Sequence, residues 1–192
     1  MRLLLAPEDG SALIEASFVI PILIVLAIGA AEVGLLGIDY MTVTNAAREG
    51  ARTGAAAADY TDPGPPALDA DDLILEAVEE AACNLRHGEL VEVSIYRAEA
   101  DGSMPVLPSG FVNTYVNSGS LQCDIDGHGL AAGTDCCPWD PATRDREPPS
   151  LDMVGVKVVF SHEGVTGLFP FPTVNWTETA VMQIEPDTRG QQ

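Results

Sequence analysis

Two features near the start of the chain could take part in chemistry: a peptide bond between small residues and a carboxylate at the entrance to an apolar stretch. Gly10 and Ser11 follow directly after MRLLLAPED. Glu15 precedes ASFVIPILIVLAIGAA, which carries no further charge until Glu32. A charged side chain in a membrane helix costs about 2.5–3.5 kcal/mol, so it tends to persist where a partner or a processing enzyme uses it.

The apolar stretch is long enough to cross a membrane. From Phe18 to Ile38 it covers about 21 residues, which as a helix span roughly 31 Å, about the thickness of a hydrocarbon core. A secretory signal peptide carries its small cleavage residues after the apolar run. Here Gly10 and Ser11 lie before it, so cleavage after Gly10 removes residues 1–10 as a leader and leaves the anchor on the mature protein.

Such a cleavage gives Glu15 a specific role. It exposes a new amine on Ser11, which in a bundle of these helices can pair with Glu15 of a neighbour and cancel two charges in lipid. Glu15 then sets the register of assembly. The residues alone leave a second interpretation open, in which Glu15 sits at the membrane interface and extends toward water.

The region after the anchor is expected to be extracytoplasmic. Counting Arg2 against Arg48 and Arg52 points the other way, but long domains translocate with little regard to charge. All the cysteines lie after the anchor, which suits an oxidising compartment. We therefore predict a single-pass membrane protein whose carboxyl-terminal domain is outside the cytoplasm.

Composition excludes some partners. The formal net charge is −20, and Lys157 is the only lysine of the 192 residues. Nucleic acid is excluded as a partner because phosphates need a clustered basic surface. Anionic lipid headgroups are disfavoured for the same reason, and membrane lipid is contacted through the one apolar helix.

Helical spacing continues from the anchor to Ala58, so we predict one long helix over residues 11–58. Gly50 and Gly54 lie on a small-residue side of this helix, which permits close packing either with another subunit or with the protein's own sheet. Residues 59–68 contain four prolines and glycines and are predicted to form a linker.

Residues 69–192 are predicted to form one exported α+β domain. Capping acids at 69–72 start a helix that runs to His87, with Gly88 as its stop and Leu73, Ala77, Val78, Ala81 and Leu85 on its buried face. Alternation predicts antiparallel strands over 90–98, 153–162 and 174–184, with Val91, Val93 and Ile95 on one side of the first. An insertion at 99–150, rich in Gly, Pro, Asp and Ser, separates the first strand from the second.

The cysteines are candidates for disulfide bonds. They are Cys83, Cys123, Cys136 and Cys137. Because a bond between adjacent cysteines is strained, we expect Cys123 to pair with Cys136 or Cys137, and the other to reach Cys83. Zinc is not expected, since the paired C-x-x-C spacing is missing.

No metal or catalytic site is predicted. Residues 124–135 partly imitate a calcium loop, but His128 at its fifth position and Asp135 at its twelfth depart from that pattern. The sequence contains no recognised catalytic motif, so we expect no cofactor and no enzyme. We expect His162 to be a structural imidazole and Trp176 to lie in the core.

Three segments resemble one family: GSALIEASFVIP at 10–21, TNAAREGARTGA at 44–55 and TETAVMQIEP at 177–186. The chain resembles TadE-like and TadG-like proteins, minor pilin-like components of tight-adherence (Flp) pilus systems. The resemblance implies that Gly10 precedes the bond cut by a prepilin peptidase and that Glu15 is the fifth residue of the mature chain. It also implies a long amino-terminal helix followed by a small sheet.

The expected function is therefore assembly of a tight-adherence, type IV-like pilus. The expected partners are a prepilin peptidase and other pilin-like subunits of the Tad system. The alternative is a membrane-tethered extracytoplasmic binding or adhesion module unrelated to pili, in which the anchor only holds a ligand-binding loop.

Overall fold

The computed structural model describes residues 9–62, 68–83, 85, 87–107, 109–117, 130–132, 137–165 and 173–186. A long helix, α1, is followed by a second helix and a five-stranded antiparallel sheet of order β5-β4-β3-β6-β7. The helices are α1 (Asp9–Ala57) and α2 (Ala70–Ala82), with a short 3-10 helix, η1 (Pro141–Thr143). The sheet strands are β3 (Gly88–Arg97), β4 (Val112–Asn117), β5 (Leu130–Ala132), β6 (Met153–Glu163) and β7 (Thr173–Gln183).

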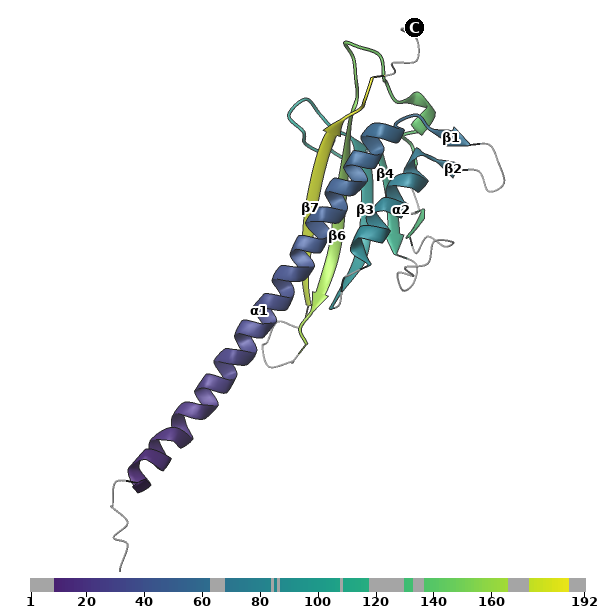
Figure 1. Ribbon diagram of the computed structural model, residues 1–192. Coiled ribbons are helices and arrows are strands. Elements are labelled where there is room, and N and C mark those ends of the chain that lie inside the picture. The colour runs from purple at the N-terminus through teal and green to yellow at the C-terminus, as the bar shows by residue number, and fades with distance from the viewer. Residues whose placement is uncertain are drawn as a thin grey trace, which may run out of the picture.

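Both helices pack on the same face of the sheet, and the amino-terminal half of α1 projects beyond it as an uncovered rod (Figure 1). The central strands β3 and β6 pair antiparallel along their length, and β6 pairs with all of β7. The predicted α+β class, with a long amino-terminal helix and a helix on a small antiparallel sheet, is confirmed.

The carboxyl-terminal half of α1 belongs to the core of the domain. Val43, Ala46 and Ala51 are fully buried, with β6 and α2 around them. Gly50 lets the elements come this close: a Cβ added there would lie 2.5 Å from Val78 Cγ2 on α2. A Cβ at Gly54 would lie 2.9 Å from both Ile74 Cδ1 and Val154 Cγ1. These two glycines therefore face the protein's own domain.

The helix α2 begins as expected but ends early. Asp69 accepts hydrogen bonds from the backbone N–H groups of Asp71 and Asp72, and the Asp72 carboxylate accepts one from the backbone N–H of Asp69, which completes a capping box. The helix stops at Ala82 rather than His87, because the Cys83 N–H turns back to the Glu80 carbonyl and β3 already starts at Gly88.

The buried face of α2 is also rotated from the predicted one. Of the predicted positions, Val78 is fully buried, while Leu73 and Ala77 are only partly covered. Asp71 and Glu79 are buried although they are acids, so a pattern based on apolar residues misplaces the face. The buried residues are Ala70, Asp71, Ile74, Leu75, Val78, Glu79 and Ala82.

Two strand predictions need correction. A bulge between Leu90 and Glu92 reverses the alternation at the start of β3, so Leu90 is buried and Val91 is 41 % exposed. The insertion was predicted without strands, yet it contributes β4 and β5 to the sheet. Within the predicted linker, β1 (Thr61–Asp62) pairs with β2 (Leu68–Asp69).

Replacing Gly50 by Ala is expected to destabilise the domain by about 1–3 kcal/mol, because the new methyl group overpacks the contact with Val78. Urea unfolding of the detergent-solubilised protein, followed by circular dichroism, measures this change. Gly34→Ala is the matched control, since a Cβ at Gly34 meets nothing within 4 Å. Equal stability of the two variants would contradict the close packing of α1.

Candidate functional site

The uncovered part of α1 is the most prominent candidate for function. Among the described residues, α1 is the one helix long and apolar enough, by length and composition, to cross a membrane. Its large apolar side chains there point outward on all sides. The exposed residues are Leu13, Ile14, Phe18, Val19, Ile20, Ile22, Leu23, Ile24, Val25 and Leu26. A helix that is apolar all round needs an apolar surrounding, which lipid or other helices supply.

The predicted processing and assembly residues lie at the free end of this rod. Gly10 and Ser11 are in the first turn of α1, which begins at Asp9. Glu15 follows one turn later and is exposed. No side chain in the described part of the chain forms a hydrogen bond or ion pair with Glu15. Its carboxylate is thus presented outward from the apolar rod.

Two further acids of α1 are used within the chain itself. Glu32 Oε2 accepts a hydrogen bond from the backbone N–H of Val165, 3.2 Å away, just after β6. Asp39 is 1 % exposed, and its Oδ2 lies 2.9 Å from His162 Nδ1 on β6. The pair fixes the height at which β6 lies along α1, and it gives His162 a structural partner.

An aromatic contact lies beside this pair. The rings of Tyr40 on α1 and Trp176 on β7 meet edge to face, with centroids 5.4 Å apart. Trp176 also packs against Phe160, which is fully buried. Helix and sheet are therefore joined by a buried hydrogen bond and an aromatic pair near the point where α1 leaves the sheet.

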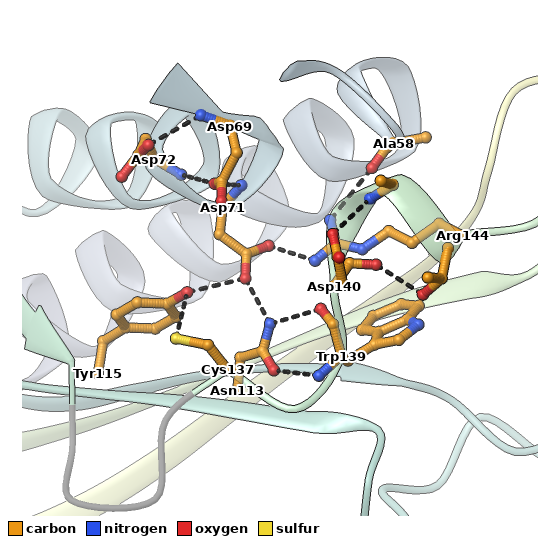
Figure 2. A network of polar contacts seen from close by, with 12 residues as sticks. Ala58, Asp69, Asp71, Asp72, Asn113, Tyr115, Cys137, Trp139, Asp140 and Arg144 are labelled. Atoms are coloured by element: carbon orange, nitrogen blue, oxygen red, sulfur yellow. Dashed lines mark hydrogen bonds and ion pairs between the residues drawn. The ribbon is translucent and has the colours of Figure 1, made fainter. Parts of the chain in front are cut away.

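A second cluster of polar side chains is buried at the opposite end of α1 (Figure 2). Asp71, near the start of α2, is 2 % exposed and accepts hydrogen bonds through Oδ2 from Asn113 Nδ2 at 2.6 Å and the Tyr115 hydroxyl at 2.8 Å. Its Oδ1 pairs with the Arg144 guanidinium. The amino-terminal end of a helix favours a negative charge, which helps to stabilise Asp71 there.

This cluster fastens the insertion to the rest of the domain. Asn113 on β4 donates to the Trp139 carbonyl and accepts from the Trp139 N–H, both at 2.8 Å. Arg144 stacks 4.3 Å above the Trp139 ring and donates to the Ala58 carbonyl at 3.3 Å, just after α1. Two helices, one strand and the segment around η1 are thus held by one connected set of contacts.

The chemistry of the cluster is that of a structural tie. Burial, and next the charge of Asp71, raise the pKa of the Tyr115 hydroxyl far above its usual range, so it stays a proton donor to Asp71. Asp71 is neutralised by Arg144, whose Nε is buried without a hydrogen-bond partner. No positive sign of catalysis is seen in these contacts.

Of the cysteines predicted to form disulfide bonds, the structure describes Cys83 and Cys137. Cys83 forms the carboxyl-terminal cap of α2. Cys137 has a φ of 72°, and its Sγ lies 3.5 Å from the Tyr115 hydroxyl. Both are in disulfide form. Cys123 and Cys136 lie outside the described residues, so the pairing stays a prediction. His128 and the rest of the calcium-like segment 124–135, apart from residues 130–132 in β5, also lie outside them.

The sequence predictions included His162 as a structural imidazole but missed its partner Asp39 and the cluster of Asp71 and Arg144. Asp39 and His162 are 123 positions apart, and Asp71 and Arg144 are 73 apart. For Asp39 a signal was available, because it is an acid directly after the apolar run of α1. For Arg144 the signal was the scarcity of basic residues, since the chain has only nine.

The chain thus combines one helix long and apolar enough to cross a membrane with a small α+β domain built around the end of that helix. Residues 10–52 match the family model described as TadE-like protein, so the resemblance expected from the sequence is confirmed. The match covers the exposed rod and the first part of α1 within the domain. Neither the curated proteins nor the solved structures contain a significant match.

Replacing Asp71 by Ala is expected to cost about 3–5 kcal/mol of unfolding free energy, because it leaves Arg144 buried without its counter-charge. Urea unfolding of the solubilised chain measures the loss. As a control, Glu49→Ala breaks the exposed pair with Arg52 on α1 and is expected to cost only about 0–1 kcal/mol. Similar losses in the two variants would contradict the structural role of the cluster.

Proposed function

We propose that this chain is a minor pilin-like component in the assembly of a tight-adherence, type IV-like pilus. The observation that carries the proposal is the exposed apolar half of α1 with Glu15 near its start, in the segment that matches TadE-like protein. The other half of α1 is occupied by the domain, so the rod is the part of the helix that remains for lipid and for other subunits.

The proposed mechanism begins with removal of residues 1–10 by a prepilin peptidase. The new amine of Ser11 then pairs with Glu15 of a neighbouring pilin-like subunit of the same system. Two opposite charges that meet in lipid remove most of the cost of placing each there alone. The pairing fixes the stagger between neighbouring rods, while the domain lies outside the cytoplasm.

Glu15 suits this role better than the other acids of the helix. Glu32 accepts a hydrogen bond from Val165, and Asp39 pairs with His162, both within the chain. The carboxylate of Glu15 is exposed. Placing an unpaired carboxylate in an apolar surrounding costs free energy. A positively charged partner from outside the chain therefore lowers the free energy more at Glu15 than at Glu32 or Asp39.

A second candidate function is that of a membrane-tethered binding or adhesion module. It is favoured by the loop between β3 and β4, at the end of the domain far from the uncovered rod (Figure 1). Val106 is 90 % exposed and Leu107 60 % exposed there. Beside them lies a cavity of about 290 Å³, lined in part by Arg97, Glu99 and Phe111.

Processing predicts a specific amino terminus. Protein extracted from membranes of cells that contain the pilus system is expected to begin at Ser11, because the peptidase cuts after Gly10. Amino-terminal sequencing or intact-mass spectrometry measures this directly. A Gly10→Val variant, whose larger side chain blocks the cut, is the control and should keep its leader. An unmodified chain that still begins at Met1 would refute the leader.

Neutralising Glu15 separates the two functions. The variant Glu15→Gln is expected to insert into the membrane normally but to lose co-purification with other pilin-like subunits, because the partner amine then has no counter-charge. Losing one member of a buried ion pair costs about 3–5 kcal/mol. Affinity purification of the tagged protein after mild solubilisation, with mass spectrometry of the bound subunits, measures the loss.

Glu32→Gln is the matched control, since it changes an acid of the same helix that is already engaged by Val165. It should retain the partner subunits. Retention of partners by Glu15→Gln as well would disprove the assembly role of Glu15 and favour the adhesion module.

A further inference from the structure

We propose that the membrane-facing end of the domain lies within the headgroup layer of the bilayer that α1 crosses. This end, here called the membrane rim, consists of Glu163, Val165, Thr173 and Asn175 with the Tyr40 and Trp176 rings. Its partner is the surface of a zwitterionic lipid bilayer. The inference rests on the membrane anchoring that the proposed function includes, and it adds a second lipid contact made by the sheet.

The length of the apolar surface on α1 is the first argument. Exposed apolar side chains run from Leu13 to Met41, and Val33, Ile38 and Met41 are each more than half exposed. At about 1.5 Å per residue this surface is about 42 Å long. A hydrocarbon core is about 30 Å thick, and the headgroup regions bring the total to about 40–45 Å. A core of this thickness that begins at Leu13 ends near Val33, so the turns of the apolar surface from Val33 onward lie at the level of the headgroups.

The domain reaches down to the same turns. The Val165 N–H donates to Glu32 Oε2 at 3.2 Å, which places the end of β6 about 13 Å below Met41, given a rise of about 1.5 Å per residue. The contact of Asp39 with His162, at 2.9 Å, fixes β6 against α1 two turns further up. Figure 1 shows the end of β6 and the start of β7 beside the middle of α1.

The side chains of the membrane rim suit an interface between lipid and water. Val165 is 49 % exposed, and Tyr40 is 37 % exposed with its ring against Trp176. Tyr and Trp are enriched at this depth because their rings are apolar and carry one polar group each. Thr173 and Asn175 are exposed at the start of β7 and can bond to headgroups.

The charges select the kind of lipid. Glu163 is exposed at the end of β6, and the whole chain carries a net charge of −20. No lysine or arginine is among the residues of the membrane rim. An anionic headgroup layer would repel this surface, whereas phosphatidylcholine presents no net charge.

Depth-dependent quenching of tryptophan fluorescence tests the inference. The full chain, with Trp139→Phe and Trp176→Phe, receives one new tryptophan by Val165→Trp and is reconstituted in phosphatidylcholine vesicles. Lipids brominated near the top of the acyl chains are expected to quench its emission and to leave it blue-shifted. Val106→Trp in the same background is the control at the far end of the domain and should be unaffected.

Leu23→Trp separates this inference from the proposed function. Quenching at Leu23→Trp but not at Val165→Trp would overturn the membrane rim and leave the anchoring intact. No quenching at Leu23→Trp would overturn the anchoring and the membrane rim together. Quenching at both, without quenching at Val106→Trp, supports the inference.

A measurement on the unaltered chain covers the case in which the tryptophan variants fold poorly. A lipid with a photoreactive group at its headgroup is activated in vesicles that carry the full protein, and labelled peptides are found by mass spectrometry. Labelling of the peptide with Glu163 and Val165, together with α1, supports the membrane rim. Labelling of α1 alone would overturn it.

Discussion

The close contact of α1 with its own domain is the constraint on which the rest of the structure depends. One continuous helix from Asp9 to Ala57 must suit lipid along its first half and a protein core along its second. Small residues make the second half possible, because Gly50 and Gly54 bring the helix backbone against Val78, Ile74 and Val154. Large apolar side chains cover the first half of the helix and make it suited to an apolar surrounding. The change between them divides the helix into an exposed apolar part and a part buried in the domain.

The two buried polar clusters lie at the two ends of this contact. Asp39 with His162 lies where α1 leaves the sheet, and Asp71 with Arg144 lies beside the end of α1 at Ala58. An apolar contact between a helix and a sheet can slide with little penalty. Buried polar groups that bond to each other cannot, since sliding leaves them unpaired. The clusters therefore give a single alignment to a surface made largely of Ala, Gly and Val.

Local patterns in the sequence were sufficient for most of the fold. The apolar run, the capping acids before α2 and the alternation in β6 and β7 are signals between near neighbours. They placed α1, β6 and β7 and the start of α2, but not the end of α2, which lies at Ala82 instead of His87. β4 was missed because it lies in a segment rich in Gly and Pro, although Val112, Thr114 and Val116 alternate. The bulge at Leu90 and the pairs of Asp39 and Asp71 depend on residues far away in the chain, so no local pattern predicts them. Glu15 and the bond after Gly10 act between molecules, and their roles stay predictions.

The absence of any break in α1 between its uncovered rod and the core has a mechanical consequence. The helix continues through Pro21 and enters the domain without a hinge segment. A pull on the rod is carried straight into the layer between α1 and β6, parallel to the strands. Every contact along that layer then resists the force at the same time, instead of opening one after another from an end. A protein built in this way transmits a force from the rod to its domain with little extension of its own.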